Sequence, residues 1–264
     1  MRKLSFSRKS LGIPYALFLL VFVIAPLLVL FYYAFTDGQG QFTIANLTGF
    51  FTNPNTMGTL CYSFALAIVT TVVCLLLAYP IAYILAFSNM KSKSVILMLF
   101  VMPMWINFSL RITALKEVLT VLEGNLAMHP FLNAVIGMTY DFLPFMILPI
   151  YTTISKLDKA LREAAMDLGA SELETFLKIT LPLSVPGIIS GVSMVFLPAM
   201  TNYVVLDTLY NSTYIMGSLI GSYFAAYNWH GGSMIALILL GIICLFTLLT
   251  NGSEEENTRG GALL

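Results

Sequence analysis

The sequence predicts an all-helical protein that crosses a lipid bilayer six times. Hydrophobic residues make up 58% of the 264 residues and charged residues only 10%, whereas about 25% of a typical soluble domain is charged. The mean hydropathy is +0.88, and long apolar runs recur along the chain. A soluble domain of this size has too little interior to cover so much apolar surface, which excludes a soluble enzyme, a nucleic-acid-binding protein and a disordered chain.

Six apolar runs are long enough to span a membrane, which takes roughly 20 mostly apolar residues per helix. The first run exceeds the roughly 7–15 apolar residues of a signal peptide, so we expect it to be retained as a span. One transmembrane domain therefore covers residues 11–250, between an N-terminal segment (1–10) and a polar tail (251–264). The predicted spans are Leu11–Phe35, Tyr62–Phe87, Val95–Thr113, Asn133–Ile154, Pro182–Met200 and Gly231–Thr250.

The basic residues predict the orientation of these spans. Because cytoplasmic loops carry an excess of Lys and Arg, the basic side is the inner one, and both termini are predicted to be cytoplasmic. The outer loops are then 36–58, about 114–132 and about 201–230, where Lys116 lies, with Arg111 near a span end. Eleven of the 13 basic residues fall on the inner side: Arg2, Lys3, Arg8, Lys9, Lys91, Lys93, Lys156, Lys159, Arg162, Lys178 and Arg259.

The cytoplasmic loop between spans four and five, about 155–181, is polar but has helical periodicity. Gly169 suits a helix end that needs a left-handed residue, and Ser171 with Glu174 three residues later forms a capping box. The loop therefore predicts two short helices joined by a glycine turn. The first is either an interfacial surface helix or a docking helix for a cytoplasmic partner. Its apolar stripe consists of Leu157, Leu161, Ala164, Ala165 and Leu168.

The same loop carries a long spaced motif. Glu163-Ala164-Ala165 is followed after three residues by Gly169, and after nine more by Ile179, Leu181 and Pro182. This pattern resembles the EAA motif of ABC importer permeases, which have the MetI-like fold. The resemblance implies that the helix docks on a separate cytoplasmic ATPase and transmits its ATP-driven closure to the spans. The implied coupling residues are Glu163, Ala164, Ala165, Asp167, Leu168, Gly169 and Ala170.

The chain is not expected to hydrolyse ATP. A phosphate-binding loop of the Walker A type needs a Gly-Lys dipeptide, and none occurs in the sequence. No cofactor is therefore expected in this chain, and ATP and magnesium belong to the partner. The three cysteines lie inside apolar runs and His129 and His230 are isolated, so neither a disulfide framework nor a metal site is expected.

Further segments resemble the spermidine/putrescine branch of these permeases, notably 103–112 and 143–151. The resemblance implies a polyamine importer of the bacterial inner membrane. Its partners would be a second permease subunit, two copies of a cytoplasmic ATPase, an external polyamine-binding protein and membrane lipid, with no nucleic acid. Two features depart from the branch: His230 replaces a frequent proline, and the tail is acidic at Glu254–Glu256.

A polyamine cation needs carboxylates and aromatic faces along its path. Ionisable residues at membrane depth are functional candidates, but Asp141 can also pair with Arg111 at similar depth. Trp105 can instead anchor the chain at the membrane interface, and Asp207 can be a turn residue. Import of another solute, transport driven by an ion gradient and a purely structural role remain alternatives. The candidate pathway residues are Trp105, Asn107, Tyr140, Asp141, Tyr203 and Asp207.

Glycines and prolines predict how the spans pack and bend. Gly187 and Gly191 form a small-xxx-small pattern in span five, which favours close approach of a neighbouring helix. Prolines within the spans predict kinks or broken helices. They are Pro26, Pro80, Pro103, Pro144, Pro149 and Pro198.

Overall fold

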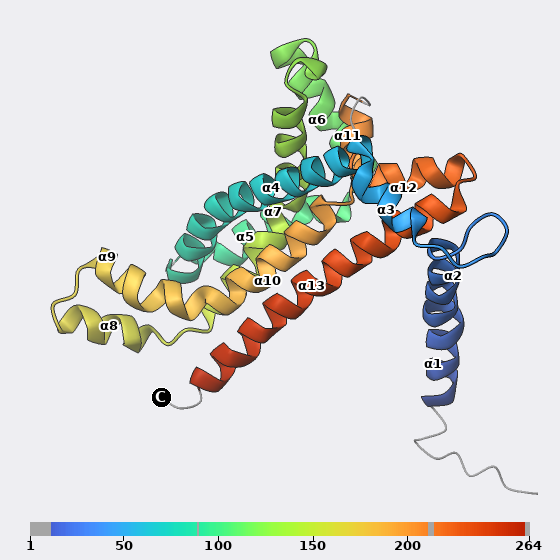
Figure 1. The fold of residues 1–264 in the computed structure, drawn as a ribbon. Helices are drawn as coiled ribbons and strands as arrows, with labels where there is room; N and C mark the ends of the chain where they lie inside the picture. The colour runs from blue at the N-terminus through green and yellow to red at the C-terminus, as the bar shows by residue number, and fades with distance from the viewer. Residues whose placement is uncertain (1–11, 89, 211–213, 262–264) are drawn as a thin grey trace, which may run out of the picture. The chain divides into compact units, whose positions relative to one another are not determined.

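The computed structural model describes residues 12–88, 90–210 and 214–261, and these residues are almost entirely helical (Figure 1). By their internal contacts they fall into two compact units. The first unit extends to Gly58 and includes Leu219–Ile242, whereas the second comprises Thr59–Ser218 and the chain from Ile243 onward. The predicted all-helical class is confirmed.

The first unit contains the first predicted span and the segment that follows it. The span is one helix with a π-helical turn in its middle, made of α1 (Gly12–Leu19), η2 (Leu20–Ile24) and α2 (Ala25–Ala34). The short helix α3 (Ala45–Thr52) follows it. The unit also includes the end of α12 (Met216–Ala225) and the first part of α13 (Trp229–Gly261).

Polar contacts connect these helix ends. The ring nitrogen Nδ1 of His230 lies 2.9 Å from the Tyr33 carbonyl oxygen. The Asn46 amide donates to the carbonyls of Ala34 and Thr36 at 2.9 and 3.1 Å. The Asn46 bond to Ala34 satisfies a carbonyl at the C-terminal end of α2, where the last carbonyls have no intrahelical partner.

A tight turn follows α2. The backbone N–H groups of Gln41 and Gln39 each donate to Asp37 Oδ1 at 2.9 Å. These two bonds favour the carboxylate form, so they hold the pKa of Asp37 below its usual value.

The second unit holds the remaining helices, and the boundary of the units falls within α4. Its helical pair α8 and α9 lies at the N-terminal end of α10 (Figure 1). The elements are α4 (Pro54–Phe87), α5 (Lys93–Val101), η3 (Met102–Trp105), α6 (Phe108–Glu123), η4 (Leu126–Met128), α7 (Pro130–Ser155), α8 (Lys159–Asp167), α9 (Glu172–Thr175), η5 (Phe176–Thr180), α10 (Leu181–Ala199) and α11 (Tyr203–Leu209).

Five helices in the described residues are long and apolar enough to cross a membrane, and a bent pair raises the number to six. The predicted count is therefore matched, but two predicted starts were too late. The second span begins at Pro54 rather than Tyr62, and the helix of the fifth begins at Glu172 rather than Pro182. The five helices are Gly12–Ala34, Pro54–Phe87, Pro130–Ser155, Glu172–Ala199 and Trp229–Thr250.

The predicted third span, Val95–Thr113, is not one straight helix. Lys93–Trp105 and Phe108–Glu123 are bent by 101° at the break between them. Pro103 has no N–H to donate to the preceding turn, and Ile106 has extended backbone angles. The Asn107 side chain then accepts hydrogen bonds from the N–H groups of Ser109 and Leu110, which starts a new helix.

The other prolines do not produce such a break. Pro80, Pro144, Pro149 and Pro198 lie inside uninterrupted helices, and Pro26 lies in the first turn of α2. In a membrane helix, neighbouring groups can satisfy the carbonyl that a proline leaves free. Break formation at Pro103 therefore depends on the competing cap at Asn107.

The helices α7 and α10 pack at very short range. A Cβ atom on Gly187 would lie 2.6 Å from Thr153 Oγ1 and 2.9 Å from the Pro149 carbonyl oxygen. A Cβ on Gly191 would lie 2.6 Å from Met146 Sδ. The close packing predicted from these two glycines is confirmed.

The last candidate span ends at Thr250, as predicted. The helix α13 continues beyond it to Gly261, so residues 251–261 of the predicted tail are helical. The predicted N-terminal segment 1–10 and residues 262–264 lie outside the described residues.

We predict that Gly187→Ala destabilises the protein by about 1–3 kcal/mol, the usual cost of overpacking a tight contact. The added methyl group must displace Thr153 or separate α7 from α10. Unfolding in mixed detergent micelles measures the change. Gly241→Ala is the matched control, because nothing lies within 4 Å of its Cβ position. Equal stability of the two variants would contradict the close contact.

Candidate functional site

Side-chain caps and a glycine turn define the shape of the loop between α7 and α10. The Asp158 carboxylate accepts a hydrogen bond from the Ala160 N–H at 3.0 Å and caps the start of α8. Gly169 has φ +88°, a left-handed conformation that costs a residue with a side chain about 1–2 kcal/mol. Ser171 and Glu174 form the reciprocal capping box that starts α9. The predicted glycine turn and capping box are confirmed.

One face of α8 carries apolar side chains that this chain leaves exposed. Leu161 is 50% exposed, and Leu168, the residue after the helix, is 90% exposed. Glu163, Ala164, Asp167 and Gly169 are exposed as well, whereas Ala165 and Ala170 are half-buried. An apolar face within a polar segment is typical of a surface that a partner covers.

The opposite face of α8 contacts the end of α4. The Arg162 guanidinium lies over the Phe87 ring, 5.1 Å from its centroid. The Nη2 atom of Arg162 also lies 3.5 Å from Glu172 Oε1 at the start of α9. The sequence analysis used Arg162 only to predict the orientation of the spans, so it missed this cation–π contact.

Four rings continue from this contact into the spans, and we call Tyr79, Tyr83, Phe87 and Phe176 the aromatic ladder. The ring centroids of Phe87 and Tyr83 are 5.0 Å apart, and Phe176 lies 5.4 Å from Tyr83 and 5.7 Å from Tyr79. The Tyr79 hydroxyl lies 2.8 Å from Ser184 Oγ. The four-residue spacing of the three rings on α4 was visible in the sequence, but their pairing with Phe176 was not.

Within the membrane helices, Arg111 and Asp141 form a buried ion pair. Arg111 is 7% exposed and Asp141 3%, and Arg111 Nη2 lies 2.5 Å from Asp141 Oδ1. Within the described part of the chain, Nε and Nη1 of Arg111 have no hydrogen-bond partner. The pair joins α6 to α7 and neutralises a positive charge that would otherwise repel a cation.

The other candidate pathway residues lie on separate elements. Trp105 is 71% exposed at the break in the third span, where Asn107 serves as a helix cap. Tyr140 is exposed on α7, and Tyr203 and Asp207 are exposed one turn apart on α11. In the residues that the structure describes, no hydrogen bond, ion pair or ring contact joins these side chains to one another.

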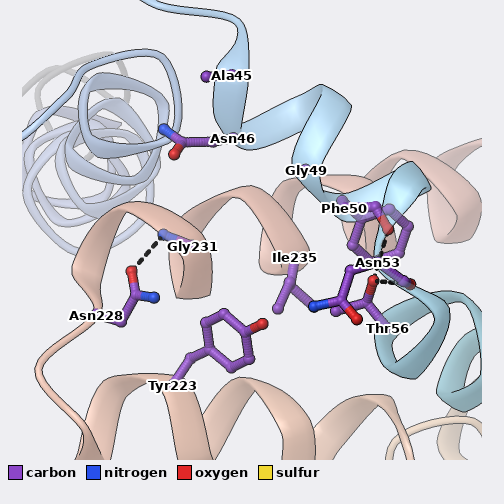
Figure 2. Close-up of a pocket in the computed structure, with 10 residues that line it drawn as sticks. All are labelled: Ala45, Asn46, Gly49, Phe50, Asn53, Thr56, Tyr223, Asn228, Gly231 and Ile235. Carbon is purple, nitrogen blue, oxygen red and sulfur yellow. Dashed lines mark hydrogen bonds between the residues drawn. The ribbon is translucent and has the colours of Figure 1, made fainter.

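The first unit contains a polar pocket of about 220 Å³ that the sequence analysis missed. In Figure 2, Tyr223 and Asn53 turn their polar ends toward the same space. The pocket combines residues from two predicted outer loops and carries no formal charge. Its lining residues are Ala45, Asn46, Gly49, Phe50, Asn53, Thr56, Tyr223, Asn228, Gly231 and Ile235.

Comparison with known families defines the class of the protein. A family model described as the binding-protein-dependent transport system inner membrane component matches residues 78–252. The match covers the ladder residues on α4, the whole loop with α8, and the ion pair. The chain belongs to this family, and it is a transport subunit rather than an enzyme.

Two relatives show which members of this family the chain is similar to. The spermidine/putrescine transport system permease protein PotB of Haemophilus influenzae is 34% identical over 253 residues, which cover 88% of this chain and 87% of the relative. The PotB protein of Escherichia coli K12 is 36% identical over 227 residues, which cover 79% of this chain and 81% of the relative.

Solved structures agree on the fold. A chain in the crystal structure of a bacterial alginate ABC transporter has a TM-score of 0.75 at 13% identity, and the match covers 95% of this chain and 94% of that chain. A chain of the MetNI methionine ABC transporter has a TM-score of 0.60 at 14% identity, with 78% and 99% covered. The predicted fold of the ABC importer permeases is confirmed.

We predict that removing one member of the buried ion pair is costly. Asp141→Asn or Arg111→Met leaves the partner charge without its counter-charge, and we expect a loss of about 3–5 kcal/mol in unfolding free energy. The double variant is expected to lose less than either single variant, because no unpaired charge remains. Detergent unfolding of the three variants measures this, and additive losses would rule out the pairing.

Proposed function

We propose that this chain is a permease subunit of an ATP-driven, binding-protein-dependent polyamine importer in the bacterial inner membrane. The observation that carries the proposal is the exposed apolar face of α8 within the EAA motif. Leu161 and Leu168 lie in a charged segment, which supports a position of α8 outside the bilayer. A cytoplasmic ATPase that covered this face would also contact Glu163 and the small residues Ala164 and Gly169.

The proposed assembly contains three kinds of partner. A PotC-like second permease would form the translocation path with this chain, and two copies of a PotA-like ATPase would dock from the cytoplasm. A PotD-like binding protein would deliver substrate from outside. The distribution of basic residues supports this orientation, with both termini and α8 on the cytoplasmic side.

Polyamines are the proposed substrates because the PotB relatives are spermidine/putrescine transport permeases. The charges of the chain are compatible with a cation. Asp141 neutralises Arg111 within the spans, and Asp207 on α11 offers an exposed carboxylate beside the Tyr203 ring one turn away. We propose Trp105, Asn107, Tyr140, Asp141, Tyr203 and Asp207 as pathway residues.

The polar pocket of the first unit is a proposed contact for the binding protein. Residues 45–56 and 223–228 both come from loops that the basic residues assign to the outer side. The amide and phenol groups that line the pocket can hydrogen-bond an uncharged polar segment of a partner. A cation would be held weakly there, since no carboxylate lines the pocket.

Two alternatives have different consequences. An importer for an anion or a sugar would use the same α8 surface but would not transport polyamines. A secondary transporter driven by an ion gradient would need no ATPase, which leaves the exposed face of α8 without a role. The EAA motif favours the ATP-driven class.

Uptake into proteoliposomes distinguishes the substrates. We expect the reconstituted complex to accumulate labelled spermidine when ATP is supplied to the ATPase side, and to accumulate neither sulfate nor maltose. Absence of ATP-dependent spermidine uptake by an assembled, ATP-hydrolysing complex would refute the polyamine assignment.

We predict that Gly169→Asp weakens co-purification with the ATPase about tenfold, because a side chain at positive φ disfavours the turn that presents α8. Gly124→Asp is the matched control. Its φ of +80° imposes similar strain, but Gly124 ends α6 in a predicted outer loop. An equal loss of ATPase in both variants would argue against docking through α8.

We predict that Gly49→Leu lowers uptake stimulated by the binding protein, because the new side chain enters the polar pocket. Nothing lies within 4 Å of a Cβ atom at Gly49, so the fold accommodates the change. Gly58→Leu is equally unobstructed but lies outside the lining of the pocket. Uptake at rising concentrations of binding protein is the measurement, and identical curves would exclude the pocket as a contact.

A further inference from the structure

The helix α8 is short and has little surface with which it can pack against the rest of the chain. It is nine residues long, and Leu161 on its apolar face is half exposed. Isolated helices of this length are marginal in water, so its placement depends on tertiary contacts. A docking helix can move its own spans only if it is attached to them by more than a flexible loop.

Arg162 supplies such an attachment. Its guanidinium lies over the Phe87 ring at 5.1 Å, and its Nη2 atom lies 3.5 Å from Glu172 Oε1. One side chain thus connects α8 to the last residue of α4 and to the first residue of α9. The arginine side chain is partly buried, whereas Glu172 is largely exposed, so the ring contact is the less screened of the two.

The aromatic ladder carries this attachment to a second span. Tyr83 contacts both Phe87 and Phe176, and Phe176 lies on η5, which is continuous with α10. Tyr79, one turn before Tyr83 on α4, also contacts Phe176, and its hydroxyl lies 2.8 Å from Ser184 Oγ. A displacement of Arg162 should therefore displace both α4 and α10.

The next contact along α10 leads to the helix that holds Asp141. Gly187 lies three residues after Ser184 and packs directly against Thr153 and Pro149 of α7. Because this interface leaves no room for a Cβ atom, α10 cannot shift without moving α7 or losing the contact. The contacts thus extend from α8 through α4 and α10 to the C-terminal part of α7.

We propose that Arg162 and the aromatic ladder are positioning residues that transmit the movement of α8 to the spans. The inference rests on the proposed function, since it requires an ATPase on the exposed face of α8. It goes further by assigning the transmission to side chains on the opposite face, which do not touch the ATPase. Loss of the ladder should therefore uncouple ATP hydrolysis from transport, while the complex remains assembled.

Two substitutions test the contact. Phe87→Leu keeps an apolar side chain but removes the ring, and Arg162→Lys keeps the charge near Glu172 but removes the planar group. In the reconstituted complex we expect each variant to hydrolyse ATP and to lower the spermidine transported per ATP roughly fivefold. The double variant should be no worse than the more affected single variant, because both remove one contact.

Phe87→Tyr and Phe131→Leu are the controls. Phe87→Tyr retains a ring for the guanidinium and should keep the wild-type ratio of transport to hydrolysis. Phe131→Leu removes a ring pair of similar geometry outside the ladder, since Phe131 lies 5.7 Å from the Tyr62 ring. This variant should leave the ratio of transport to hydrolysis unchanged. Co-purification of the ATPase with each variant shows whether the complex is assembled.

The outcomes separate the inference from the proposed function. An unchanged ratio in Phe87→Leu would overturn the inference, as would loss of the bound ATPase from that variant while Phe131→Leu retains it. If instead the wild-type chain binds no ATPase, or Gly169→Asp binds it normally, the proposed function fails and not the ladder alone.

Discussion

The structure depends on the absence of hydrogen-bond partners in the lipid core. Every backbone N–H and C=O group within the bilayer must be satisfied by the chain, which favours helices for all the spanning segments. The bent third span obeys the same constraint. The backbone turns there because the Asn107 side chain accepts two hydrogen bonds from the helix it starts. A break without such a cap would expose backbone groups to hydrocarbon.

The scarcity of charge follows from the same solvent. The few charged side chains at membrane depth are costly, and Arg111 and Asp141 offset this cost by pairing with each other. Most other charges lie outside the spans, where α8 uses them for solubility while it exposes Leu161 and Leu168. The chain thus separates its polar functions into an ion pair between spans and a helix outside them.

The parts that the sequence predicted correctly are those encoded by local patterns. The periodic apolar runs predicted most spans, Gly169 predicted a positive φ, and Ser171 with Glu174 predicted a cap. The prolines predicted kinks or breaks, and one break occurs just after Pro103. The six prolines gave the same signal, however, so the pattern could not show that only Pro103 is followed by a competing cap. The contacts of Phe87 with Arg162, and of Tyr79 with Ser184, join residues far apart in the sequence, and no local pattern encodes such pairs.

The continuous helix from Glu172 to Ala199 can act as one rigid rod. These 28 residues form one helix, with a π-helical turn near the start, and at 1.5 Å per residue the helix is about 42 Å long. A tilt of about 5° around one end would move the other end by about 4 Å, on the scale of one helical turn. A small rotation at the Glu172 end therefore becomes a larger displacement at the Ala199 end, provided that the helix does not bend.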